Sequence, residues 1–330
     1  MTLEQNITND EQSRRKSRIV LPGTSEYEAG MRRLREANKN QEKTNKGKKG
    51  RKSSEGDSPR TMPTGSFNVD SLINIDPEKD IFYSEDQDSD GNYIGLPIAL
   101  KQALNHAGTN GYVATMPELI AAKLKAGKNH NFWKNWFTTH TEENIGIDKK
   151  GRFYSANEPV LVIVNGGGIL TPERIKQAYA EDLIDNSARY TEEEFDNLLD
   201  GNLLDGSSIK LHSLEDIRQR VLDLPHRFGV VMPYSVAQGT KSGYHKKKDF
   251  ITNPLAIARN AGSENLEEYH ELAKHSDGDL GCYHPFNGRD ASVPQGRVLF
   301  LGSSYLGLSG YGYLDYNGRF VGVRAPEAQK

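Results

Sequence analysis

The spacing of apolar residues predicts short helices and strands from about residue 80 onward. The longest apolar run, Val160 to Val164, is typical of a buried strand. A threonine followed closely by proline predicts helix starts at Thr115 and Thr171. We expect further helices over residues 97–106, 191–199, 213–223, 254–260 and 266–275, and strands over 80–84, 159–164, 227–232, 297–301 and 319–324.

The order of these elements sets the expected fold class. Strands do not alternate regularly with helices, which favours an α+β fold over a doubly wound sheet. Residues 67–330 are enough to bury a core as one domain without covalent staples. The single cysteine, Cys282, excludes an internal disulfide framework and a CxxC-based zinc site. The apolar runs are too short to span a membrane, so we expect no membrane-spanning helix.

Charge divides the chain into an arm and a body. Residues 1–66 carry 15 Lys+Arg and 9 Asp+Glu, a net charge of +6; the whole chain carries −3, so residues 67–330 carry −9 (−3 minus +6). The arm is rich in charge and has one aromatic residue, Tyr27, so we expect it to be disordered. Its cluster Lys46–Lys52 could make weak nucleic-acid contacts, but without aromatic residues between the charges a solubilising arm is favoured.

The first residues contain no apolar signal segment. The start, MTLEQNITNDEQSRRK, has charges but no apolar run after them. We therefore expect a cytoplasmic protein by default, although a virion protein or one exported by an unconventional route would have the same start.

Two motifs resemble metal sites without completing them. Residues 86–91 (DQDSDG) match the first half of a calcium loop, but the twelfth position is Pro97 where a bidentate glutamate is needed, so a turn is favoured. His270 and His275 are five residues apart, whereas zinc-protease histidines are four apart on one helix face. We interpret both histidines as helix-surface residues.

Two further motifs resemble catalytic sites. Asn165–Gly168 (NGGG) lies between a strand and a helix, where backbone N–H groups could cradle an anion, but it lacks the lysine of a phosphate-binding loop, and a tight glycine turn is favoured. Cys282 and His284 have no third partner for nucleophilic catalysis. We expect no catalytic residue, cofactor or metal; an enzyme or nucleotide-binding protein using Asn165–Gly168 remains the alternative.

The segment NFWKNWF concentrates aromatic residues. Phe132, Trp133, Trp136 and Phe137 are spaced as on one face of a helical turn. Such aromatic pairs are usually core anchors, and we predict that role here.

Residues 302–318 differ from the rest of the chain. They hold four of its fifteen tyrosines, alternating with Gly and Ser. Tyrosine provides large contact area at low entropic cost, and Ser, Gly and Asn adapt hydrogen bonds, as on binding surfaces. A strand on each side would present the segment as a loop. A Gly/Tyr-rich barrel corner is the structural alternative.

Three features together resemble the variable proteins of diversity-generating retroelements, which have a C-type-lectin (formylglycine-generating-enzyme-like) fold. They are the helix within Tyr112–Leu124, the NFWKNWF segment and the closing NGRFVGVRAP, Asn317–Pro326. The resemblance implies an α+β, C-type-lectin-like body over residues 67–330, with a helical insertion at about 171–275 and a variable region at about 303–317. It also implies that Phe320, Val321 and Val323 pair with the first strand of the body.

In that family, asparagine codons are copied with errors at adenine, which cannot yield Lys, Glu, Gln, Met or Trp. None of these five occurs between residues 303 and 317. The resemblance implies that Leu301, Leu306, Leu308 and Leu314 point inward. It assigns the variable, ligand-binding positions to Ser304, Tyr305, Ser309, Tyr311, Tyr313, Asp315, Tyr316 and Asn317.

The sequence lacks motifs of two related families, which excludes their activities. The triplets of calcium-dependent sugar-binding lectins are missing, and one cysteine is too few for formylglycine-generating chemistry. We therefore expect a non-enzymatic protein that recognises varied macromolecular partners, most simply proteins. A structural phage protein with a nucleic-acid-binding arm is a further alternative.

Overall fold

The computed structural model describes residues 69–75, 81–83, 95–181, 183–219, 224–284, 289–303, 307–315 and 317–325. The predicted basic arm and the DQDSDG motif lie outside these residues. So do Ser304, Tyr305, Leu306 and Tyr316.

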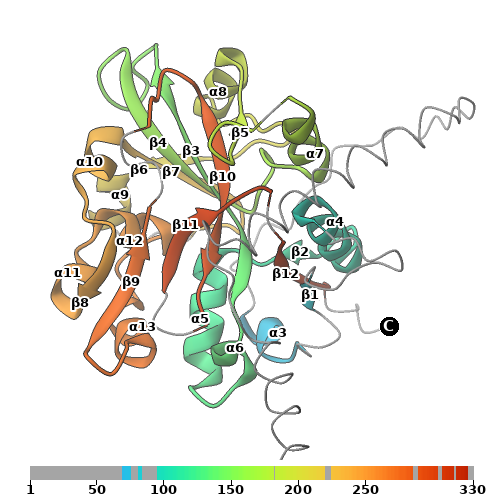
Figure 1. The fold of residues 1–330 in the computed structure, drawn as a ribbon, viewed down its shortest axis with the longest axis vertical. Helices are drawn as coiled ribbons and strands as arrows, with labels where there is room; N and C mark the ends of the chain where they lie inside the picture. The colour runs from blue at the N-terminus through green and yellow to red at the C-terminus, as the bar shows by residue number, and fades with distance from the viewer. Residues whose placement is uncertain are drawn as a thin grey trace, which may run out of the picture. The chain divides into compact units, whose positions relative to one another are not determined.

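Helices and strands of modest length make up the described chain (Figure 1). The helices are α3 (Val69–Ile73), α4 (Leu96–Ala107), α5 (Met116–Ala126), α6 (Asn131–Lys134), α7 (Pro172–Ala180), α8 (Glu192–Leu199), α9 (Leu214–Gln219), α10 (Tyr234–Gly239), α11 (Lys247–Ile251), α12 (Pro254–Arg259) and α13 (Leu266–Ala273). The strands are β1 (Ile81–Tyr83), β2 (Tyr112–Val113), β3 (Phe137–Asp148), β4 (Glu158–Asn165), β5 (Ala188–Arg189), β6 (Leu211–Ser213), β7 (Phe228–Pro233), β8 (Gly243–Lys246), β9 (Asp279–Tyr283), β10 (Gln295–Leu301), β11 (Leu308–Gly312) and β12 (Arg319–Val323).

The strands form a large mixed sheet and a small one. Within the described residues, the large sheet runs β6-β7-β4-β3-β10-β11-β9-β8, with β5 also paired to β10. Its pairs are antiparallel except β6 with β7 and β9 with β11. In the small sheet β12 lies between β1 and β2. Val321 is opposite Ile81 and Phe320 opposite Phe82, which confirms the predicted pairing with the first strand for these two residues; Val323 is instead opposite Tyr112 of β2.

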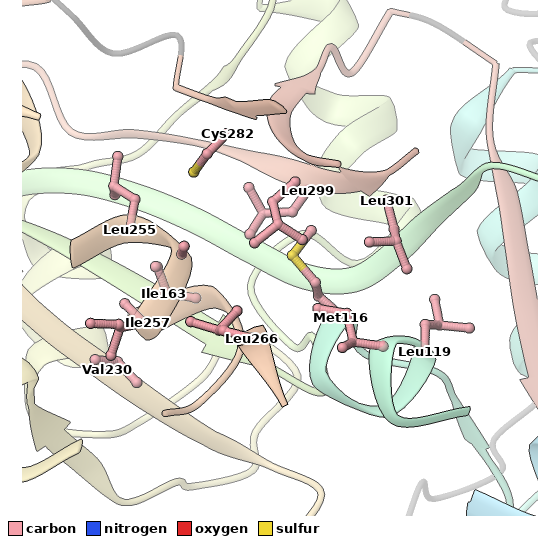
Figure 2. Packing of buried hydrophobic residues seen from close by; sticks show 14 of the residues in the cluster. Met116, Leu119, Ile163, Val230, Leu255, Ile257, Leu266, Cys282, Leu299 and Leu301 are labelled. Atoms are coloured by element: carbon pink, nitrogen blue, oxygen red, sulfur yellow. The ribbon is translucent and has the colours of Figure 1, made fainter. Parts of the chain in front are cut away.

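Each face of the large sheet packs on its own hydrophobic cluster. In β4, Leu161 and Ile163 face a cluster with α5, α9, α12 and α13, and the alternate valines Val160, Val162 and Val164 face a second cluster with α4, α7 and α8. Figure 2 shows the first cluster, where Met116 and Leu119 of α5 lie near Leu299 and Leu301 of β10. Burial on both faces explains why this strand is an unbroken apolar run.

Several predicted elements are confirmed, together with their caps. Thr115 and Glu118 form a reciprocal capping box at the start of α5, and the Thr171 side chain accepts a hydrogen bond from Arg174 N at the start of α7. The segment 171–275 contains helices α7 to α13 but also strands β5 to β8. It is therefore part of the large sheet as well as a helical addition to it.

Three sequence interpretations are wrong. The aromatic segment is not one helical turn: α6 ends at Lys134 and β3 begins at Phe137. Phe132, Trp133 and Phe137 are nevertheless core residues, as predicted, and Trp136 is half-buried. His270 is not on the helix surface but buried. Finally, residues 302–318 are not a single loop, because β11 lies inside them and pairs with β10 and β9.

The strand β3 has no counterpart in the sequence analysis. Its sequence, FTTHTEENIGID, is polar, yet nearly all of its residues are buried. Glu143 in its middle forms an ion pair with Arg259 at the end of α12, with both side chains fully buried and N–O distances of 3.0 and 3.1 Å. Arg259 also donates to the backbone oxygens of Tyr283 (2.7 Å) and Leu308 (3.5 Å). One buried cation thus connects β3 to both β9 and β11.

Replacing Arg259 with Met should destabilise the fold by about 3–5 kcal/mol, because Glu143 would remain as an unpaired buried charge. The double variant Glu143→Leu, Arg259→Met removes both charges and should recover part of this loss. Urea unfolding followed by circular dichroism measures both. Lys247→Ala, which removes solvent-exposed ion pairs to Glu267 and Glu271, is the control and should change the free energy of unfolding far less than Arg259→Met does. A double variant at least as unstable as Arg259→Met alone would contradict the role assigned to the pair.

Candidate functional site

The glycine loop Asn165–Gly168 follows β4 and makes the tight turn that its sequence favours. Gly166, Gly167 and Gly168 have φ angles of 86°, 65° and 110°, a backbone conformation that residues other than glycine rarely adopt. A Cβ atom on Gly167 would lie 1.9 Å from Nε2 of His140, and one on Gly168 would lie 2.1 Å from a guanidinium nitrogen of Arg227. The loop therefore has no room for larger residues.

Other polar groups of the chain form hydrogen bonds with the backbone of this loop and of the residues after it. Gly166 N donates to the oxygen of His140 (2.9 Å), and Leu170 N donates to Oε1 of Glu142 (2.8 Å). Arg227 donates to the oxygen of Gly167 (2.9 Å) and to Asp205 (2.8 Å). A carboxyl group of β3 thus binds a backbone N–H just after the loop, between it and the start of α7.

Burial dominates the electrostatics beside the loop. It raises the pKa of Glu142 to about 8, so this carboxyl group is protonated at neutral pH. Burial, together with the nearby His226 and Arg227, lowers the pKa of His140 to about 3, which keeps its ring neutral. A neutral acid and a neutral imidazole fit a packed polar core.

The other motifs considered for chemistry do not assemble. The Cys282 thiol is buried beside Arg259 and Asn253, and burial raises its pKa to about 11, so it is not a thiolate at neutral pH. His284 binds the oxygen of Thr240 at 2.7 Å instead. Across the described parts of the chain, no group of three or more His, Cys, Asp or Glu residues is arranged to hold a metal ion. Nor does any helix there have the length and apolar character that crossing a membrane requires.

The tyrosine-rich segment forms the second candidate site. Tyr311 is 44% exposed, and its ring lies between those of Tyr283 on β9 and Tyr313, with centroid distances of 6.1 and 5.9 Å. Tyr244 on β8 continues the series, 5.7 Å from Tyr283. We name these four residues the tyrosine row. Two of them, Tyr244 and Tyr283, were not singled out from the sequence because they lie outside the tyrosine-rich segment.

The predicted ligand-binding positions differ in exposure. Tyr311 is exposed, Tyr313 and Asn317 are half-buried, and Ser309 and Asp315 are buried. Of the predicted inward positions, Leu301, Leu308 and Leu314 are fully buried, which confirms those three. The described part of the site is therefore a buried leucine framework with tyrosines on its outer side.

The backbone of this segment is held by side chains from distant elements. The fully buried Lys123 of α5 donates to the oxygen of Gly302 at 2.7 Å, and the Tyr179 hydroxyl donates to the oxygen of Leu314. Burial, followed by the charge of Lys128, lowers the pKa of Lys123 to about 7. Leu314 N donates to the oxygen of Asn186 at 3.1 Å. These contacts use the main chain of the segment and not its side chains.

Glu142→Gln should remove a pH dependence of stability, because the amide cannot ionise and still offers an oxygen to Leu170 N. The pKa of Glu142 is raised in the folded state, so its contribution is complete below about pH 4.5 and is lost as the pH rises through about 8. The free energy of unfolding of the variant should therefore gain on wild type by about 1.4 kcal/mol per pH unit across this window.

Urea unfolding at several pH values measures this difference. Glu173→Gln, on the exposed side of α7, is the matched control and should differ from wild type by a constant amount. Parallel pH profiles for wild type and Glu142→Gln would contradict the buried, protonated state of Glu142.

Comparison with known proteins supports the architecture. No protein-family model matches the sequence, and no curated protein matches it. This chain is similar to a solved structure, with a TM-score of 0.52 and 24% identity. That structure is described as the accommodation of massive sequence variation in Nanoarchaeota by the C-type lectin fold. The alignment covers 74% of this chain and 96% of that one. At this identity the likeness establishes the fold alone, and the chain has the α+β, C-type-lectin-like fold that its sequence indicates.

Proposed function

We propose that this chain is a non-enzymatic ligand-binding protein whose surface around β11 is diversified by a retroelement to recognise varied protein partners. The C-type lectin fold of a protein that accommodates massive sequence variation supports the first half of this proposal. The residue content of positions 303–317, which avoids the five residues that adenine mutagenesis of asparagine codons cannot produce, supports the second.

The observation that carries the proposal is the way in which the segment is anchored. Lys123, Arg259 and Tyr179 all donate to backbone oxygens, at Gly302, Leu308 and Leu314 respectively. Every residue type has this oxygen, so a change of side chain between these points leaves the anchors in place. A scaffold of this kind separates the stability of the body from the identity of the exposed residues.

Chemistry on the exposed side fits recognition. Tyr311 combines a large apolar ring with a hydroxyl group and loses few rotamers on binding, and Gly310 and Gly312 flank it. The predicted variable positions with exposed or half-buried side chains, Tyr311, Tyr313 and Asn317, are the described residues that we assign to the ligand surface. Ser309 and Asp315 would act through the packing beneath it.

Tyr311→Ser should change the free energy of unfolding by less than about 1 kcal/mol, because Tyr311 is exposed. Leu308→Ala, three residues earlier on the same strand, should cost about 2–5 kcal/mol, because its side chain is fully buried. Urea unfolding of both variants measures the contrast. A loss on Tyr311→Ser as large as that on Leu308→Ala would show that the row supports the fold, against the proposal.

Sequencing the gene across a growing population tests diversification directly. We expect changes to cluster in codons 303–317, at positions where a neighbouring repeat carries adenine, while the codons of Lys123, Tyr179 and Arg259 stay fixed. An unchanging segment with no nearby repeat would refute diversification and leave the tyrosines as ordinary structure.

A further inference from the structure

We propose that Tyr244 and Tyr283 form a fixed half of the binding surface, next to the variable half that contains Tyr311 and Tyr313, and that this tyrosine row binds acidic segments of protein partners. The inference rests on the proposed function, because it takes the surface around β11 to be the ligand face. It adds a constant contribution from β8 and β9 and a chemical class of partner.

The row crosses three neighbouring strands. β11, β9 and β8 are adjacent in the sheet, and ring-to-ring distances of 5.7, 6.1 and 5.9 Å connect Tyr244, Tyr283, Tyr311 and Tyr313 in that order. Its two best exposed members come from different halves: Tyr244 is 42% exposed and Tyr311 44%. A ligand resting on Tyr311 is therefore within reach of a residue that diversification would not change.

Strand alternation explains why Tyr244 and Tyr283 share a face. Cys282 is buried in the first hydrophobic cluster, so the next residue of β9, Tyr283, points to the opposite face of the sheet. On β8, His245 is buried and its neighbour Tyr244 is exposed; Tyr244 is opposite Gly281 in the register. Gly281 has no side chain, which leaves the two tyrosine rings to meet across it.

Charge near Tyr244 favours an acidic partner. Residues 67–330 carry a net charge of −9, yet residues 241–248 (KSGYHKKK) contain four lysines and no acidic residue, and Asp249 follows. Lys246 pairs with Asp279, and Lys247 pairs with Glu267 and Glu271. Lys241 and Lys248 are exposed and make no ion pair with another described residue.

A buried cation also lies next to the other end of the row. The guanidinium of the buried Arg297 lies 5.5 Å from the centre of the Tyr313 ring. The exposed lysines near Tyr244 are the cations that can attract carboxylates and orient them during encounter. The partner that suits this surface is a peptide segment in which aliphatic or aromatic residues lie between acidic residues.

Ring orientation favours a protein segment over single-stranded nucleic acid. The pairs Tyr244–Tyr283 and Tyr311–Tyr313 meet edge to face, at 78° and 76°, and Tyr283–Tyr311 is tilted at 58°. Successive bases stack on exposed ring faces, which this arrangement does not offer in series. An uneven surface of ring edges and hydroxyl groups suits side chains and backbone amides.

Selection of a phage-displayed random peptide library on the immobilised full-length chain tests the inference. We expect the enriched peptides to carry more Asp and Glu than the input library. Tyr244→Ala and the double variant Lys241→Glu, Lys248→Glu should each weaken the binding of a synthetic enriched peptide about tenfold. The control is Lys101→Glu, Lys176→Glu, which changes net charge equally at exposed sites on α4 and α7 and should leave the affinity unchanged.

The outcomes separate this inference from the proposed function. If Tyr311→Ser abolishes peptide binding while Tyr244→Ala and the double lysine variant bind as wild type does, the ligand surface stands and its fixed, cationic half is refuted. If Tyr311→Ser has no effect, the proposed function itself is refuted. Enriched peptides without an acidic bias, no enrichment at all, or competition by an oligo-dT strand that depends on Tyr244 would each overturn the acidic-protein assignment.

Discussion

The ion pair between Glu143 and Arg259 is the interaction on which the arrangement of the large sheet depends. Glu143 lies in the middle of β3, which pairs with β4 and β10, and Arg259 lies at the end of α12. With both side chains fully buried, neither charge can be solvated by water, so each requires the other. Nη1 of Arg259 donates to backbone oxygens of β9 and β11, so the residue that pairs with Glu143 also holds the strands that carry the tyrosine row.

Anchoring through the main chain separates the two demands on the C-terminal segment. Its framework is the buried leucines and the oxygens held by Lys123, Arg259 and Tyr179, and its outer side is tyrosine and glycine. Residues far away in the sequence therefore provide the contacts that stabilise this segment. Under the proposed function, the exposed positions are left to contribute mainly to recognition, which is the property that a diversified surface needs.

Buried polar side chains of β3 also explain the structure of the NGGG turn. The NGGG turn looks like an anion cradle because its backbone N–H groups follow a strand and precede a helix, but β3 supplies a carboxyl group and a histidine ring that fill the space. The chain therefore uses a glycine turn to bring β3 and β4 close to the Arg227 side chain. A short motif carries no information about a side chain that another strand brings to it.

Local sequence determined the elements whose signals are local. The apolar run Val160–Val164 and the capping threonines Thr115 and Thr171 could be assigned because periodicity and capping act over a few residues. The inward leucines of the C-terminal segment came instead from the family resemblance. Only the tertiary structure decided that β3, with Glu142 and Glu143, is a buried strand, because the partners that make those carboxyl groups tolerable are Leu170 N and Arg259, 28 and 116 residues away. It also decided that Tyr244 and Tyr283 join Tyr311, since sheet pairing and not sequence proximity brings those rings together.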